Sequence, residues 1–122
     1  MDVEQLLRAY HDTLLALDAQ RIETGGQPRR WNRLVDQLQG LQLQLRRTVA
    51  GRAGITGFVR DDNLTVRQWS APFALAWDTE LARGELERQA EDAAGITAFN
   101  AAVTLREFDA GRLDLGWLPK GR

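Results

Sequence analysis

The chain of 122 residues is 43% hydrophobic, carries a formal net charge of −1 and contains no cysteine. This length suits a single domain with a real core, and the near-neutral charge argues against a general binder of nucleic acid or anionic membranes. Without cysteine there are no disulfides, thiolate nucleophiles or sulfur-ligated metals. We find neither a signal peptide nor a run of about 18 apolar residues, so we expect a cytoplasmic protein with no membrane segment.

The charge is divided unevenly along the chain. Residues 1–60 contain nine arginines and six acidic residues, a net charge of +3. Residues 61–122 contain seven basic and eleven acidic residues, a net charge of −4. The asymmetry is compatible with the alignment of a partner and equally with an ordinary solvated surface.

The first two helices are predicted from apolar residues that recur at helical spacing. The first is expected over residues 2–23, with Asp2 as its N-cap. Gly25 and Gly26 should end it, because glycine tolerates the positive φ of a helix C-cap. The second is expected over residues 28–49 and starts with a proline. A short loop joins the two helices, so they should pack antiparallel.

A third and a fourth helix are predicted on either side of an acidic turn. The third, residues 51–60, is short, and its three glycines would let a neighbouring helix approach closely. In the turn, residues 61–63, the short polar residues Asp61, Asp62 and Asn63 can each cap the next helix with a side-chain oxygen. The fourth helix should cover residues 64–77. Its apolar face consists of Val66, Trp69, Phe73, Ala76 and Trp77.

The last two helices are predicted over residues 79–91 and 96–110. Asp78 is the expected cap of the fifth helix, and Gly111 the expected C-terminal signal of the sixth. One face of the fifth helix is acidic and should be solvated: Glu80, Glu85, Glu87 and Glu91. The residues of the sixth helix that should face the core are Ile96, Phe99, Ala102, Val103, Leu105 and Phe108. The tail, residues 112–122, is expected to pack on the last hairpin.

The segment D-D-N-L-T-V-R-Q-W-S-A, which starts at Asp61, resembles the turn and second-helix start of a HEAT repeat. A wider run, from R-R-W-N-R-L-V through V-R-Q-W-S-A to A-A-V-T-L-R-E-F, is similar to small bacterial HEAT-like proteins of unknown function. The resemblance covers roughly residues 28–112. It implies that residues 1–122 form one all-α domain, a right-handed α-α superhelix of about three stacked helical hairpins of HEAT/ARM-like type. It also implies that Arg67 bridges neighbouring hairpins.

No catalytic, cofactor-binding or metal-binding residues are expected. His11 is the only histidine and cannot build a typical zinc site without cysteine. Ser70, the only serine, lies among apolar residues of a helix, where it more often packs or bonds to a carbonyl than acts as a nucleophile. No glycine loop followed by lysine is present to hold a phosphate. We therefore do not expect an enzyme.

The expected function is that of a non-enzymatic protein–protein interaction module, such as an immunity or antitoxin-type protein that binds a bacterial partner. Nucleic-acid binding through the arginine-rich face of the second helix is the alternative, because arginine next to Trp31 is typical of such surfaces. Trp31 also fits the apolar stripe, which indicates a core residue instead. The oligomeric state is left open. The candidate partner-binding residues are Arg29, Arg30, Arg33, Trp77, Glu80, Glu87 and Trp117.

Overall fold

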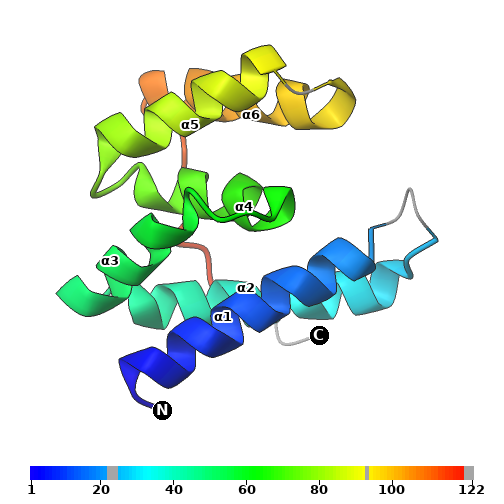
Figure 1. Ribbon diagram of the computed structural model, residues 1–122, viewed down its shortest axis with the longest axis vertical. Coiled ribbons are helices and arrows are strands. Elements are labelled where there is room, and N and C mark those ends of the chain that lie inside the picture. Colours follow the sequence, from blue (N-terminus) through cyan, green and yellow to red (C-terminus); the bar gives the residue numbers. More distant parts are fainter. Residues whose placement is uncertain (22–24, 93, 120–122) are drawn as a thin grey trace. The chain divides into compact units, whose positions relative to one another are not determined.

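The computed structural model describes residues 1–21, 25–92 and 94–119, and every regular element in these ranges is an α-helix (Figure 1). The all-α prediction is therefore confirmed for the described residues. The helices are α1 Val3–Ala19, α2 Pro28–Leu45, α3 Val49–Phe58, α4 Leu64–Ala74, α5 Thr79–Asp92 and α6 Gly95–Asp109. None of them combines the length and the apolar character of a membrane-spanning segment.

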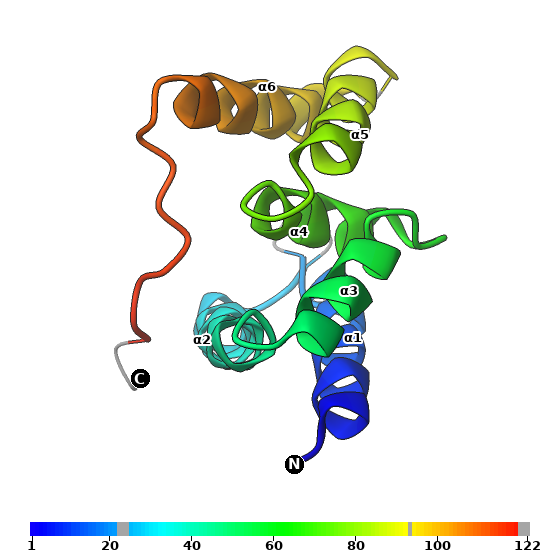
Figure 2. The ribbon, with the colours of Figure 1, turned by 90° about the vertical axis from the view of Figure 1, so that its left-hand side faces the viewer.

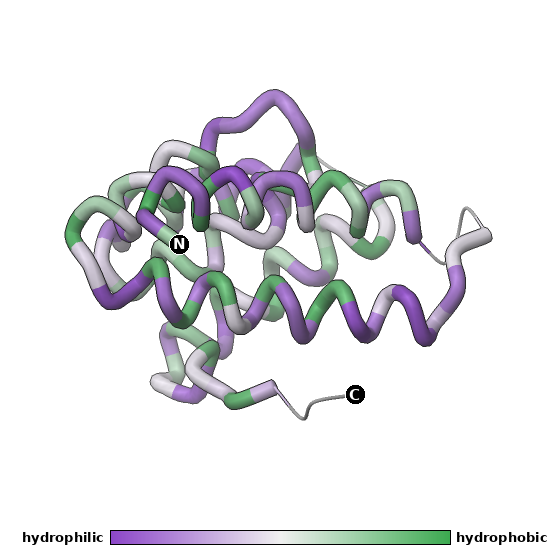
Figure 3. The backbone as a smooth tube through the Cα atoms, turned by 90° about the horizontal axis from the view of Figure 1, so that it is seen from below, coloured by the Kyte–Doolittle hydropathy of each residue, from purple (hydrophilic) through white to green (hydrophobic). Residues whose placement is uncertain are grey.

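Helices that follow one another in the chain make the principal contacts. Helix α1 packs against α2, α5 packs against α6, and α4 packs against α5. The pairs α1–α2 and α5–α6 lie side by side in both ribbon views (Figure 1, Figure 2). Hydrophobic and hydrophilic residues are interleaved along the helices, as expected for helices with one buried face (Figure 3). This pairwise packing is consistent with stacked hairpins.

The chain forms two compact units. The first unit consists of residues 1–54 together with 116–122, and the second unit consists of residues 55–115. The first unit contains ten basic and six acidic residues, a net charge of +4. The second contains six basic and eleven acidic residues, a net charge of −5. The structural division therefore separates the charge more sharply than the two halves of the sequence do.

The predicted start of α1 is confirmed, but its predicted end is wrong. Asp2 and Gln5 form a reciprocal capping box, in which the side chain of each accepts the backbone N–H of the other at 2.8 and 3.0 Å. The helix ends at Ala19, and the backbone N–H of the C-cap residue Gln20 donates to the carbonyl oxygens of Ala16 and Leu17. Gly25 has a φ of +94° but lies outside the helix. Residues 22–24, the last part of the predicted helix, lie outside the described residues.

Apolar side chains of α1 and α2 form the core of the first unit, and they include Leu6, Tyr10, Leu14, Leu17, Leu38, Leu41 and Leu45. The predicted extension of α2 to residue 49 is wrong. The chain turns so tightly after Leu45 that a Cβ on Gly51 would lie 2.0 Å from the Leu45 carbonyl oxygen. Val49 therefore starts a new helix and is 76% exposed.

The prediction that glycines of α3 permit close approach is confirmed at Gly54 and wrong at Gly57. A Cβ on Gly54 would lie 2.4 Å from the side chain of Leu7 on α1. Nothing lies within 4 Å of the corresponding position at Gly57. A glycine therefore permits close approach to α1 at only one turn of α3, the turn that contains Gly54.

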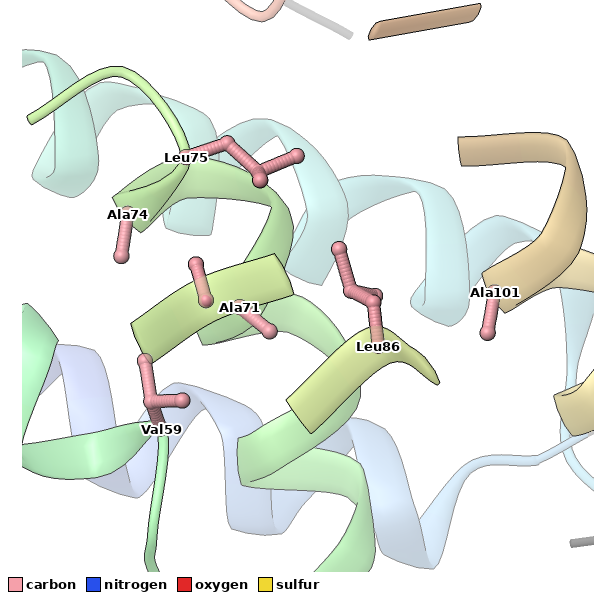
Figure 4. Close-up of a cluster of buried hydrophobic side chains, with 7 residues drawn as sticks. Val59, Ala71, Ala74, Leu75, Leu86 and Ala101 are labelled. Carbon is pink, nitrogen blue, oxygen red and sulfur yellow. The ribbon is translucent and has the colours of Figure 1, made fainter. Parts of the chain in front are cut away.

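The second unit is built on a cluster of small and branched apolar residues from several elements (Figure 4). Its buried members are Val59, Ala71, Ala74, Leu75, Ala82, Leu86 and Ala101. Four of the seven are alanine, which permits α4, α5 and α6 to approach closely. Larger side chains close the cluster at its edges, among them Trp77, Leu105, Phe108 and Leu113.

Of the three candidate caps of α4, Asn63 is the one that caps the helix. The Asn63 side chain accepts the N–H of Val66 at 3.1 Å, while Asp61 accepts the N–H of Asn63 at 3.0 Å. The side chain of Asp61 therefore stabilises the turn that precedes the cap. Helix α4 ends at Ala74, three residues before the predicted end, as the chain turns into α5.

Helices α5 and α6 lie close to their predicted positions, but the inward face of α6 differs. Thr97 and Ala101 are its buried residues. Ile96 and Phe99, which were expected in the core, are 60% and 63% exposed, and Ala102 is also exposed. Thr97 accepts a hydrogen bond of 2.6 Å from Gln68 of α4, which fixes this rotation of α6.

The prediction that Gly111 marks the C-terminal end of α6 is confirmed. Gly111 has a φ of +72°, and its N–H donates to the Phe108 carbonyl. The N–H of Arg112 donates to the Glu107 carbonyl, which completes a Schellman motif. Beyond it, Leu113 packs on the cluster of the second unit.

Candidate functional site

A cleft of about 590 Å³ opens in the second unit between the turn before α4 and the last turns of α5. Apart from Leu64 its lining is polar, with three arginines, four acidic residues and one glutamine. The charged lining residues are Arg60, Asp61, Asp62, Arg67, Glu85, Arg88 and Asp92. This volume falls within the range of small-ligand and side-chain pockets, about 300–1,000 Å³.

Arg67 is held firmly in the wall of the cleft. One of its terminal nitrogens, Nη1, donates to the carbonyl oxygens of Asp61 and Asp62 at 2.7 and 3.1 Å. Its Nε lies 3.5 Å from a carboxylate oxygen of Glu85 on α5. Arg67 thus ties the turn before α4 to α5.

Glu85 corrects the prediction of a solvated acidic face on α5. Its exposure is only 4%, and its carboxylate accepts hydrogen bonds from Gln89 at 2.8 Å and from Arg88 at 3.3 Å. Burial of a carboxylate is costly unless it is paired and hydrogen-bonded, and here both conditions hold. Glu85 is therefore a structural anchor, whereas Glu80, Glu87 and Glu91 are exposed as expected.

The cleft contains fixed and accessible charges. The guanidinium of Arg67 and the carboxylate of Glu85 neutralise each other in the wall. Arg88 is 63% exposed and lies at the opening, where Asp62 and Asp92 are also exposed. Within the described residues, His, Asp and Glu side chains form no group that could hold a metal ion. The arrangement is suited to charged side chains of a partner.

The arginines predicted for partner binding are exposed in the first two turns of α2. Arg29, Arg30 and Arg33 all face solvent, and Trp31 between them is half-buried. No acidic residue lies in the first turn, and Gln27 provides no side-chain cap. Positive charge near a helix N-terminus opposes the helix dipole, at about 0.3–1 kcal/mol per residue. Local helix stability therefore does not explain this basic group.

The remaining predicted residues have different environments. Trp77 is half-buried at the edge of the core, and its ring N–H donates to Thr56 at 2.9 Å. Glu80 and Glu87 are exposed on α5, and Glu87 lies 4.0 Å from Arg83. Arg83 also bonds to Asp109, which raises the pKa of its guanidinium.

Trp117, the last predicted residue, belongs to the first unit and is 37% exposed. Its carbonyl oxygen accepts a hydrogen bond of 2.7 Å from Gln39 of α2. Gln42, one turn later, donates to Gln39 at 3.0 Å. Both glutamines are buried. Sequence analysis missed this polar pair because each glutamine alternates with leucine and reads as part of a solvated face.

Comparison of the chain with protein-family models, with curated proteins and with solved structures finds no match. The exposed side chains of the chain are therefore the guide to its function. The most informative of these were also missed by sequence analysis: Ile96 and Phe99, which lie one helical turn apart on the outside of α6.

Proposed function

We propose that this chain is a non-enzymatic protein-interaction module, a HEAT-like right-handed superhelix of stacked hairpins that binds a bacterial protein in the manner of an immunity or antitoxin protein. One observation carries the proposal: Ile96 and Phe99 are 60% and 63% exposed on adjacent turns of α6. Burying a side chain of this size is favourable by about 1.5–3 kcal/mol. Apolar side chains that project from a helix are typical anchors for a partner protein.

Co-expression with the product of an adjacent gene tests the proposal. We expect a complex with a Kd below about 10 μM, and we expect Phe99→Asp to weaken it by at least about tenfold. Val49→Asp is the matched control, because Val49 is also an exposed apolar residue but lies in the first unit. Equal weakening by both substitutions, or a complex that Phe99→Asp leaves intact, would contradict this role of α6.

Nucleic-acid binding is the second candidate, and the basic group on α2 favours it. Arg29, Arg30 and Arg33 are all exposed in a helix start that has no acidic residue to balance them. Binding through them would weaken steeply as salt concentration rises, because phosphate contacts release counterions. A labelled single-stranded oligonucleotide, titrated at two salt concentrations against the wild type and an Arg29→Gln/Arg30→Gln variant, tests this. Affinity that neither salt nor the double substitution changes would exclude it.

A further inference from the structure

The last turn of α5 carries negative charge at the end of the helix where it is least favoured. Glu91 and Asp92 are the final acidic residues of α5, both are exposed, and this turn contains no basic residue. The carboxyl end of a helix already carries partial negative charge, so a nearby cation is stabilised there and an anion is not. No ion pair with either carboxylate is found among the described residues. The position therefore favours a cation supplied by another molecule.

Apolar side chains begin directly beyond these acids. Ile96 lies four residues after Asp92, and Phe99 lies one helical turn further along α6. Both side chains are more than half exposed. We call Glu91, Asp92, Ile96 and Phe99 the α5–α6 ledge. It presents an acidic end and an apolar end within nine consecutive residues of one unit.

The charged cleft adjoins the acidic end of the ledge. Asp92 belongs to both, and Asp62 is a second exposed carboxylate in the cleft lining. Arg60 and Arg88 also line the cleft, but Arg88 is hydrogen-bonded to Glu85. The second unit as a whole has a net charge of −5, so it attracts cations over distances longer than a direct contact.

From this arrangement we infer that the ledge receives a cationic amphipathic helix of a partner protein. Apolar side chains of that helix cover Ile96 and Phe99, and a lysine or arginine beside them lies against Glu91 and Asp92. Residues three or four apart on the partner helix provide such a combination of anchors. The inference rests on the proposed function and adds to it the chemistry of the partner, which charge complementarity selects.

Two designed peptides of about 18 residues serve as probes, since that length gives a helix of about five turns. One consists of leucine and lysine at amphipathic helical spacing, and the other has glutamate in place of every lysine. Binding to the full chain is measured by fluorescence anisotropy at low and at physiological salt. We expect the leucine–lysine peptide to bind at least about tenfold more tightly than the leucine–glutamate peptide. The difference should shrink as salt is added.

Substitutions locate the binding site. Phe99→Ala should weaken the leucine–lysine peptide about tenfold, and Glu91→Gln/Asp92→Asn should weaken it to a similar extent at low salt. Glu4→Gln is the control, because Glu4 is also an exposed acid but lies on α1 in the first unit. The affinity of this control variant for the leucine–lysine peptide should stay within about twofold of that of the wild type. Circular dichroism of each variant verifies that the helices are intact.

Three results would overturn the inference: equal binding of both peptides, a loss with Glu4→Gln as large as with the Glu91→Gln/Asp92→Asn variant, or tight binding that Phe99→Ala does not change. Equal binding of both peptides that still depends on Phe99 would remove the charge selection while leaving α6 as a docking helix. Failure of the co-expressed neighbour to bind would instead remove the proposed function, whatever the peptides do.

Discussion

Replacement of Arg67 by alanine should destabilise the second unit far more than replacement of Arg88, although both arginines contact Glu85. Arg67→Ala removes a contact of 3.5 Å to the buried Glu85 carboxylate and two hydrogen bonds to the Asp61 and Asp62 carbonyl oxygens. Arg88→Ala removes one hydrogen bond of 3.3 Å made by a side chain that is 63% exposed. The two substitutions thus separate a structural ion pair from a surface one.

The magnitude follows from what each change leaves behind. Removing one partner of a buried ion pair costs about 3–5 kcal/mol when the other charge is left alone. Glu85 keeps its hydrogen bonds from Gln89 and Arg88, and Arg67 is itself 27% exposed, so we expect about 2–3 kcal/mol for Arg67→Ala. An exposed pair contributes about 0–1 kcal/mol, which is the expected cost of Arg88→Ala.

Urea denaturation monitored through NMR signals of α4 and α5 measures the free energy of unfolding of the second unit itself. A double-mutant cycle with Glu85→Gln isolates the interaction between Arg67 and Glu85. Equal costs for the two arginine substitutions would show that Arg67 does not form a structural ion pair with Glu85. A cost below about 1 kcal/mol for Arg67→Ala, the value of an ordinary surface pair, would show the same.

The remaining predictions concern a close contact and a titrating ion pair. Gly54→Ala should lower the free energy of unfolding of the first unit, measured by thermal unfolding, by about 1–3 kcal/mol, because its Cβ would lie 2.4 Å from the side chain of Leu7. Gly57→Ala, where nothing lies within 4 Å, should raise helix stability by up to about 1 kcal/mol in the same thermal unfolding experiment. The hydrogen bond from Arg112 lowers the pKa of the Glu107 carboxyl. The pair therefore stabilises the end of α6 fully at pH values above the pKa of unfolded glutamate, about 4.3. This stabilisation is lost as the pH falls through the lower pKa of Glu107 in the folded chain. Arg112→Gln should raise the pKa of Glu107 in an NMR titration, and an unchanged pKa would contradict the pairing.

Helix starts were predictable from the sequence because local contacts determine them. The capping box at Asp2, for example, depends on residues within a few positions. Helix ends were less predictable. The end of α2 depends on the close approach of Gly51 to Leu45, which a pattern of apolar residues does not reveal. The periodic pattern continued to Val49, but the helix did not.

The candidate site was harder to predict, because burial depends on which helices meet. Glu85 reads as one of four equivalent acids on α5 until Arg67 is placed against it. The hydrophobicity of Ile96 and Phe99 suggested that they face the core. The contact with α4 instead buries Thr97, because its hydroxyl meets the amide of Gln68. Small and polar residues determined the orientation of α6, and sequence patterns weight them least.

The hydrogen bond between Gln39 and Trp117 joins residues 78 positions apart. During synthesis, the whole of the second unit is translated before Trp117 is added, since the chain is made from its N-terminal end at about 5–20 residues per second. For several seconds after its own helices have been made, the first unit therefore lacks the carbonyl oxygen that accepts the hydrogen bond of the Gln39 amide. A released chain truncated after Leu115 should therefore contain a complete acidic unit and an incomplete basic one.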